Sequence, residues 1–391
     1  MLLMVGSVGL TTLSGTFVPH FSKERHMIQE HERASGNKIS LKEAVDLVVE
    51  VPDVVYNFVG EPGIGKSSIM KGIQKRLPNH LMSYVDCSNL DLGDVCMPVI
   101  NHELRVTEYF PNSRFKLHTG NPVVILLDEF SKAMQPVKNM LHPLLERHNP
   151  RLGDISFNTA DNRVIITGNK DTDGVGDSLQ AHTRNRIVTV EVAKPTAKEW
   201  LEWAADNDID PMVMTFVNQF PQCMASYDDE SESNNPYIFN PKQQQVAFWS
   251  PRSAELASNI MKRKEMLGST ALRLALEGAV GRSAAAELLN VNALAKELPK
   301  WDDIIENPAT AKLPSQNNGA GLLLIYGAMH KVTKETMPAF MKYLRRFDVE
   351  LQSIFCFTLS QTPSKHNVTR VREFAEWNAE NQDLFRSVAG R

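Results

Sequence analysis

The sequence predicts an α/β fold in which a five-stranded parallel sheet is followed by a region made only of helices. Short apolar runs alternate with helical patterns over residues 38–194, an order typical of a parallel sheet with helices on both faces. Beyond Lys194-Pro195 the apolar residues recur at helical spacing and strand-like runs stop. The chain has 391 residues, of which 42% are hydrophobic, so it is long enough for two or three domains.

Five segments are predicted to form the strands of this sheet: residues 54–59, 81–86, 123–128, 163–168 and 187–192. Residues 123–127 are apolar throughout, which is typical of a strand buried on both faces. The connection between the second and third strands is longer than a single helix requires. Within it, residues 99–110 predict two short strands around a polar turn, and Tyr109 and Phe110 could grip a polypeptide or pack on the core.

Helices are predicted from their caps and their periodicity. Ser40 and Glu43 have the spacing of a capping box, so a helix should follow them to about residue 49. Residues 67–77 should form a second helix, which Pro78 ends. Later helices are predicted at residues 197–205, 211–219, 252–267, 271–280, 284–297, 322–330, 334–347, 349–359 and 368–388. The acidic stretch 227–235 should interrupt them as a mobile loop.

Composition excludes several classes of protein. The 42 Lys and Arg nearly balance the 46 Asp and Glu, whereas a surface built for nucleic acid would be basic. Four cysteines without a CxxC pair exclude a disulfide scaffold and disfavour structural zinc. Residues 1–19 are uncharged but rich in Gly, Ser and Thr, and the first basic side chain, His20 or Lys23, follows them. We therefore expect residues 1–37 to be a flexible extension and not a signal or membrane anchor, and the protein to be cytoplasmic.

A glycine-rich loop links the first predicted strand to the second predicted helix. It fits the phosphate-binding pattern GxxxxGK[ST], and its place between strand and helix makes the pattern credible. Glycines let backbone N–H groups point at phosphate oxygens, and the helix N-terminus favours anions. Lys66 could reach the β- and γ-phosphates of ATP, and the Ser67 hydroxyl could ligate Mg²⁺. The predicted nucleotide-binding residues are Gly60, Glu61, Pro62, Gly63, Ile64, Gly65, Lys66, Ser67 and Ser68.

Two carboxylates end the third predicted strand. Ligands of open α/β sheets lie beyond the carboxyl ends of the strands. Asp128 could therefore hold Mg²⁺, and Glu129 could orient and polarise the attacking water. A helix N-cap is the alternative interpretation of this pair. The phosphate loop upstream disfavours that alternative.

Three further positions could act on the same nucleotide. Asn169 follows the fourth strand and could contact the γ-phosphate or hold the water, although it could also be an ordinary turn residue. Arg184 and Arg186 precede the fifth strand, where an arginine could stabilise transition-state charge in a neighbouring subunit or simply be solvated. Ser250 and Pro251 predict a helix start, from which Arg252 could reach back to the nucleotide.

The order of phosphate loop, acidic pair, Asn169, Arg186 and Arg252 resembles that of the AAA+ ATPases, which have the P-loop NTPase fold. The closer resemblance is to the MoxR-like branch, in particular to its phage and prophage proteins. It rests on DLGD (91–94) with Pro98, LLDEFSKA (126–133) with a helix at 141–147, ITGN (166–169) and SPRS (250–253). It covers about residues 39–261, and 281–289 and 301–308 also look like the phage proteins. One departure is Phe130-Ser131-Lys132, where this branch commonly has an acidic residue or Asn and then Arg.

The resemblance implies a Mg²⁺-dependent ATPase that assembles into a ring, usually a hexamer. Lys66, Ser67, Asp128, Glu129 and Asn169 would act within one subunit, with Arg252 on a helical lid. Arg186 would be the arginine supplied in trans, and Arg184 is the alternative. The implied domains are residues 38–194 for nucleotide binding, 195–290 for the lid and 291–391 for a C-terminal helical region.

The resemblance also implies the partner. Such a ring would remodel or activate a protein, with a von Willebrand factor A-like adaptor as one candidate. The alternative function is a nucleic-acid-associated ATPase, such as a helicase loader or DNA motor. It rests on basic clusters at residues 71–76 and 342–346, which on helices are usually solvated. A scaffold that binds but does not hydrolyse ATP is disfavoured by the intact acidic pair.

Overall fold

A computed structural model of the chain describes residues 37–146, 148–157, 161–170, 179–314 and 318–382. The predicted N-terminal extension lies outside these ranges apart from residue 37. Within them, no helix is both long and apolar enough to cross a lipid bilayer.

The sheet has five parallel strands in the order β2-β5-β8-β1-β9. Their bounds are Tyr56–Val59 (β1), Leu81–Asp86 (β2), Val123–Asp128 (β5), Arg163–Gly168 (β8) and Val188–Glu191 (β9). All five predicted strands are confirmed, and the first and last are shorter than predicted. The register places Asp128 opposite Thr167, and Gly168 opposite Val59. The ends of β5, β8 and β1 therefore lie side by side at one edge of the sheet.

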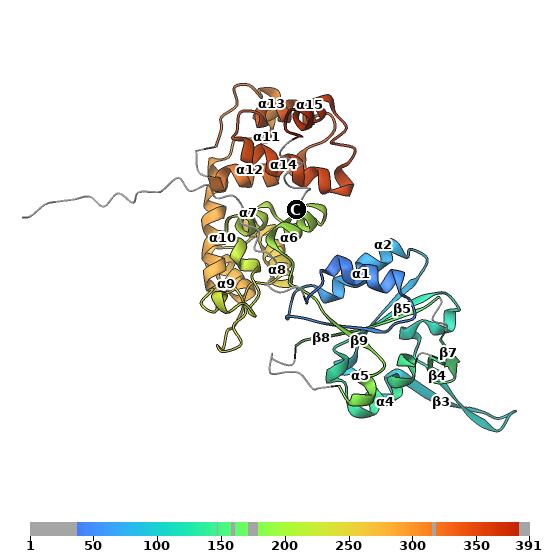
Figure 1. The fold of residues 1–391 in the computed structure, drawn as a ribbon. Helices are drawn as coiled ribbons and strands as arrows, with labels where there is room; N and C mark the ends of the chain where they lie inside the picture. The colour runs from blue at the N-terminus through green and yellow to red at the C-terminus, as the bar shows by residue number, and fades with distance from the viewer. Residues whose placement is uncertain (1–36, 147, 158–160, 171–178, 315–317, 383–391) are drawn as a thin grey trace, which may run out of the picture. The chain divides into compact units, whose positions relative to one another are not determined.

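Helices cover both faces of this sheet (Figure 1). Along β5, Val123, Ile125 and Leu127 pack in one apolar cluster with α4 (Gln135–Leu141). Val124 and Leu126 face the other cluster, which includes α1 (Leu41–Glu50) and α2 (Ile69–Arg76). This alternation follows from the two-residue period of a strand, and it explains why the segment is apolar at every position.

The predicted capping box is confirmed at the start of α1. The Ser40 backbone N–H donates to Glu43 Oε2 at 2.7 Å, and the Glu43 N–H donates to Ser40 Oγ at 3.2 Å. The predicted helix at 141–147 is wrong. Residue 141 ends α4, and His142–Leu145 forms a 3₁₀ turn, because Pro143 has no N–H to continue the α-helical pattern. Residue 147 lies outside the described ranges.

A hairpin stands between β2 and β5, as predicted. Its strands are Cys96–Asn101 (β3) and Val106–Pro111 (β4), after the short helix α3 (Leu92–Val95), and it extends away from the sheet (Figure 1). Its base is held by the turn between β6 (Arg151–Leu152) and β7 (Ile155–Ser156). There the Tyr109 N–H donates to Asp154 Oδ2 at 2.6 Å, and the Asp154 N–H donates to the Tyr109 carbonyl at 3.0 Å.

The second half of the chain is helical, as predicted, and packs around one apolar cluster that includes residues from Trp200 to Trp377. Its helices are α6 (Ala197–Asp206), α7 (Pro211–Gln219), α8 (Pro251–Met261), α9 (Ser269–Val280), α10 (Arg282–Leu294), α11 (Trp301–Glu306), α12 (Asn318–Lys331), α13 (Met337–Leu344), α14 (Val349–Gln361) and α15 (Arg372–Glu380). The end predicted for α8 at residue 267 is wrong. The helix stops at Met261, because the chain must turn before α9, which Gly268 caps.

One hydrogen-bonded chain of polar groups lies inside this apolar cluster. The Trp377 Nε1–H donates to Gln352 Oε1 at 2.7 Å, and Gln352 Nε2 donates to the Phe347 carbonyl at 2.7 Å. Gln352 is buried. A buried side-chain amide satisfied on both sides fixes the relative position of α14 and α15.

The acidic stretch 227–235 is not the mobile loop that its composition predicts. The Asp228 carboxylate is paired with Lys38 and Lys170, and Asn235 Nδ2 donates to the Gln222 carbonyl at 2.7 Å. A polar segment is ordered when its charges find partners, and these partners lie far away in the sequence.

Candidate functional site

The phosphate loop, residues 60–67, leads from β1 into a 3₁₀ turn (Lys66–Ser68) and then α2. Gly63 and Gly65 have φ angles of +76° and +98°, a region that side chains with a Cβ rarely adopt. A Cβ on Gly60 would lie 2.8 Å from the Val192 carbonyl oxygen. The glycines of the motif are therefore required by the local geometry and by the close approach of the chain after β9.

Lys66 joins the loop to the neighbouring strand β8. Its Nζ donates to the carbonyls of Gly60 and Glu61, both at 2.8 Å, and to Asn169 Oδ1 at 3.1 Å. The lysine is buried, so its charge is held among oxygen atoms at the end of the sheet. Asn169 follows β8 directly. Lys66 and Asn169, two of the predicted site residues, are thus brought together although they lie 103 positions apart in the sequence.

Asp128 lies at the end of β5, between two hydroxyl groups. Thr167 Oγ1 donates to its Oδ1 at 2.5 Å, and the Tyr84 hydroxyl donates to its Oδ2. Partial burial, together with the hydrogen bond to Asp128 and the charge of that carboxylate, raises the pKa of Tyr84 above its ordinary value. Sequence reasoning missed Tyr84, because no motif marks a tyrosine on β2 as the neighbour of a carboxylate 44 positions later.

The donor types at this edge are those that a magnesium ion prefers. The Ser67 hydroxyl and the Asp128 carboxylate are hard oxygen donors, which Mg²⁺ prefers. An ion held by few protein ligands also keeps waters and binds phosphate oxygens.

Glu129 follows Asp128 with a left-handed backbone, φ +51°. Non-glycine residues in this conformation cluster at functional sites. Its Oε2 lies 2.8 Å from Lys132 Nζ, in a partly exposed ion pair. Lys132 is a second residue that sequence reasoning did not assign, although it lies where the sequence departs from the MoxR-like pattern.

The start of α8 contacts the phosphate loop. Ser250 caps the helix, and its predicted N-cap role is confirmed by the Ser253 N–H, which donates to Ser250 Oγ at 3.2 Å. The Arg252 N–H donates to the Gly63 carbonyl at 3.1 Å. The Arg252 charge also acts on Tyr84, where it opposes the effects of burial and Asp128 on the pKa. The Arg252 backbone is therefore bonded directly to the phosphate loop.

Arg184 and Arg186 have different surroundings. Arg184 ends the short helix α5 (Ala181–Arg184) and is exposed. Arg186 Nη2 lies 2.9 Å from Glu146 Oε1, and its Nη1 lies 3.1 Å from His142 Nε2. Within the described part of the chain, no hydrogen bond or ion pair joins either arginine to the phosphate loop or to the acidic pair.

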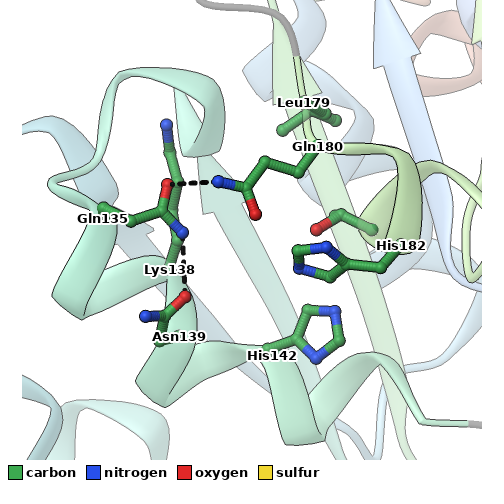
Figure 2. A pocket seen from close by; sticks show the side chains of 8 residues that line it. Gln135, Lys138, Asn139, His142, Leu179, Gln180 and His182 are labelled. Atoms are coloured by element: carbon green, nitrogen blue, oxygen red, sulfur yellow. Dashed lines mark hydrogen bonds between the residues drawn. The ribbon is translucent and has the colours of Figure 1, made fainter.

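The histidine beside Arg186 lines a small polar pocket, in which the rings of His142 and His182 lie edge to face (Figure 2). Burial lowers the pKa of His142, and the charge of Arg186 and the neighbouring His182 lower it further. On the other side of the pocket, Gln135 accepts a hydrogen bond from Gln180 at 3.3 Å. The pocket is thus lined on one side by α4 and on the other by the segment that leads to both arginines.

The comparison with family models agrees with this fold. Residues 56–190 match the family described as ATPase family associated with various cellular activities (AAA). No curated protein matches the chain. The chain is similar to Hsp104 in a closed-state cryo-EM reconstruction with ATPγS and FITC casein, with 16% identity and a TM-score of 0.34, over 65% of this chain and 46% of that chain. It is also similar to NtrX from Brucella abortus in complex with ADP, with 13% identity and a TM-score of 0.33, over 90% of this chain and 67% of that chain. The chain spans less than half of the Hsp104 chain.

Proposed function

We propose that this chain, whose residues 56–190 are an AAA domain with the P-loop NTPase fold, is a Mg²⁺-dependent ATPase of the MoxR-like type. The observation that carries the proposal is the contact of Lys66 with Asn169. It joins the phosphate loop to the residue after β8, beside the strand that ends in Asp128. Phosphate binding, metal binding and water activation thereby have candidate residues at one edge of the sheet.

Each residue has a defined role in the proposed reaction. Lys66 exchanges its carbonyl partners for oxygens of the β- and γ-phosphates, and Asn169 contacts the γ-phosphate. Ser67 and Asp128 hold Mg²⁺, which neutralises phosphate charge when it is bound. Glu129 leaves Lys132, orients a water molecule and accepts its proton as the water oxygen attacks the γ-phosphorus. The bond from that phosphorus to the β–γ bridging oxygen then breaks, and ADP carries away the negative charge.

The proposed assembly is a ring, a hexamer as the MoxR-like resemblance implies, in which a neighbouring subunit supplies an arginine. Arg184 is favoured over Arg186 for this role. Both arginines are exposed. Arg186 is paired with Glu146 and contacts His142 within its own chain, whereas no ion pair holds Arg184, at the end of α5, within the described residues. Because a trans arginine acts only after assembly, turnover per subunit should rise with protein concentration.

The proposed partner is a protein, and the β3–β4 hairpin supports this choice. Between residues 96 and 111 the hairpin contains a single arginine and two glutamates, so it offers little charge to a phosphate backbone. An exposed apolar surface of this kind is typical of contact with protein. The exposed large apolar side chains on it are Met97, Val99, Ile100, Leu104, Val106, Tyr109 and Phe110.

The nucleic-acid alternative loses some of its basis, because arginines in the two basic clusters bind groups within the chain. Arg76 is paired with Asp46 at 2.6 Å, and Arg345 with Glu380 at 2.6 Å. Arg346 donates to two backbone carbonyls. Stimulation of turnover by DNA, several-fold and lost in salt, would restore this alternative.

The test of the ATPase proposal is the Glu129→Gln variant in steady-state hydrolysis and ATP binding, with and without a Mg²⁺ chelator. We expect it to bind ATP and to hydrolyse it about 10²- to 10⁴-fold more slowly. Lys66→Ala should bind ATP weakly. The matched control is Glu265→Gln, at an exposed glutamate in the turn after α8, which should behave as wild type. Wild-type turnover by Glu129→Gln would contradict the role given to this carboxylate.

A further inference from the structure

Residues from distant parts of the chain form hydrogen bonds with the turn at residues 223–228, which follows α7. Lys194 Nζ donates to the carbonyls of Cys223 and Ala225, at 3.3 and 2.9 Å. The Ser226 hydroxyl donates to Glu61 Oε1, and it also accepts from the Asp228 N–H at 3.1 Å. The turn therefore contacts Glu61, the second residue of the phosphate loop, whose carboxyl group is buried.

Asp228 ends this turn in a cluster of four alternating charges. Lys38 Nζ lies 2.6 Å from Asp228 Oδ2 and 3.1 Å from Glu191 Oε1. Lys170 Nζ contacts the same two oxygens. The side chains of Lys38 and Lys170 are only 17% and 12% exposed, so the solvent screens these pairs less than it screens pairs at an open surface.

The hydrogen bonds of the cluster change the acidity of its carboxyl groups. Burial alone would raise the pKa of Asp228, but the hydrogen bonds from Lys170 and Lys38 outweigh it and the pKa is lowered. The pKa of Glu191 is lowered for the same reason. Both carboxylates are therefore ionised at neutral pH.

The position of Lys170 connects this cluster to the proposed phosphate contacts. Lys170 follows Asn169, whose side chain binds Lys66 of the phosphate loop. The peptide between Asn169 and Lys170 is therefore held at one end by the loop and at the other by Asp228 of the helical region. Lys38 belongs to the same cluster but has no such neighbour in the phosphate loop or the acidic pair.

We propose that Asp228, through its ion pair with Lys170, is a positioning residue that sets Asn169 for contact with the γ-phosphate and couples this contact to the turn at residues 223–228. When Lys66 and Asn169 rearrange around a bound triphosphate, Lys170 moves with them and shifts Asp228 through their ion pair. The helical region then responds differently to ATP and to ADP. This inference rests on the proposed ATPase function.

The experiment compares Lys170→Met, Asp228→Asn and their double variant with the matched variant Lys38→Met. Lys38→Met removes a cation from the same cluster without touching the residue beside Asn169. We expect similar falls in thermal stability for Lys38→Met and Lys170→Met. Turnover should fall about fivefold or more for Lys170→Met and Asp228→Asn, should fall no further in the double variant, and should stay near wild type for Lys38→Met.

Equilibrium binding of ATP and ADP in the Glu129→Gln background gives a second readout that a purely structural role would not move. Lys170→Met and Asp228→Asn should lower the ratio of ATP affinity to ADP affinity about fivefold or more, and Lys38→Met should leave it unchanged. Equal effects of Lys38→Met and Lys170→Met on both readouts would overturn the inference. If the wild type binds but does not hydrolyse ATP, the hydrolysis proposal fails and the affinity ratio still decides the inference. Binding of neither nucleotide refutes both.

Discussion

The contact between the phosphate loop and α8 predicts a large effect for Gly63→Ala. Gly63 has φ +76°, and an alanine in the left-handed region costs about 1–2 kcal/mol. The new Cβ would lie 2.7 Å from Ser250 Oγ and 3.0 Å from Ser250 Cβ, so the start of α8 must move. The Arg252 N–H would then lose the Gly63 carbonyl, at a cost of about 1 kcal/mol. The total is roughly 2–3 kcal/mol.

Urea unfolding and ATP titration measure this effect. We expect the free energy of unfolding to fall by about 2–3 kcal/mol and ATP affinity to weaken, because Arg252 leaves the phosphate loop. The control is Gly278→Ala in α9, where a new Cβ meets nothing within 4 Å and alanine should stabilise the helix by up to about 1 kcal/mol. A loss below about 0.5 kcal/mol for Gly63→Ala, a size ordinary for surface changes, would refute the reasoning.

Three further predictions follow from the described contacts. Arg184→Ala should lower turnover on the order of 10³-fold with ATP binding retained, whereas Arg186→Ala should cost less activity; the opposite ranking in a hydrolysis assay would exchange their roles. Gln352→Met should lower the free energy of unfolding by about 2 kcal/mol, because the Trp377 N–H and a backbone carbonyl lose their partners; an unchanged urea midpoint would contradict this. The pKa of His142 is lowered in the folded protein, so this histidine should stabilise the fold at pH values above about 6.5, the ordinary histidine pKa. That contribution should be lost as the pH falls through the lower pKa of the folded state. His142→Gln should therefore make the urea midpoint fall less between about pH 7.5 and pH 5.5. An equal fall in the wild type and the variant would contradict the lowered pKa assigned to His142.

Local patterns explain why much of the fold could be predicted. Residues 123–127 are apolar at every position because β5 packs on both faces, and the phosphate loop carries its glycines where φ is positive or the backbone is crowded. These signals lie within a few residues. The helix ends were less predictable, because Pro143 and the turn before α9 convert the expected helical turns into 3₁₀ turns.

The rest of the site depends on pairs that no local pattern contains. Tyr84 reaches Asp128 only because β2 and β5 are neighbours in the sheet. Asp228 was expected in a mobile loop, since its two lysine partners lie 190 and 58 positions away. Lys132 stands out in the sequence only because residues 130–132 depart from the pattern of the MoxR-like branch. Electrostatic partners of this kind follow from topology, and a single sequence does not show which of several possible charges will meet.

The shared apolar cluster of the helical half has a consequence for shortened versions of the chain. Val213 of α7, Leu288 of α10 and Ile325 of α12 belong to the same buried cluster. Cleavage or truncation after residue 290 would uncover the side chains that α12 to α15 now cover, and the remaining helices would have to bury them by aggregation or by recruiting another chain. Proteolysis of the folded protein should accordingly yield no stable fragment ending there.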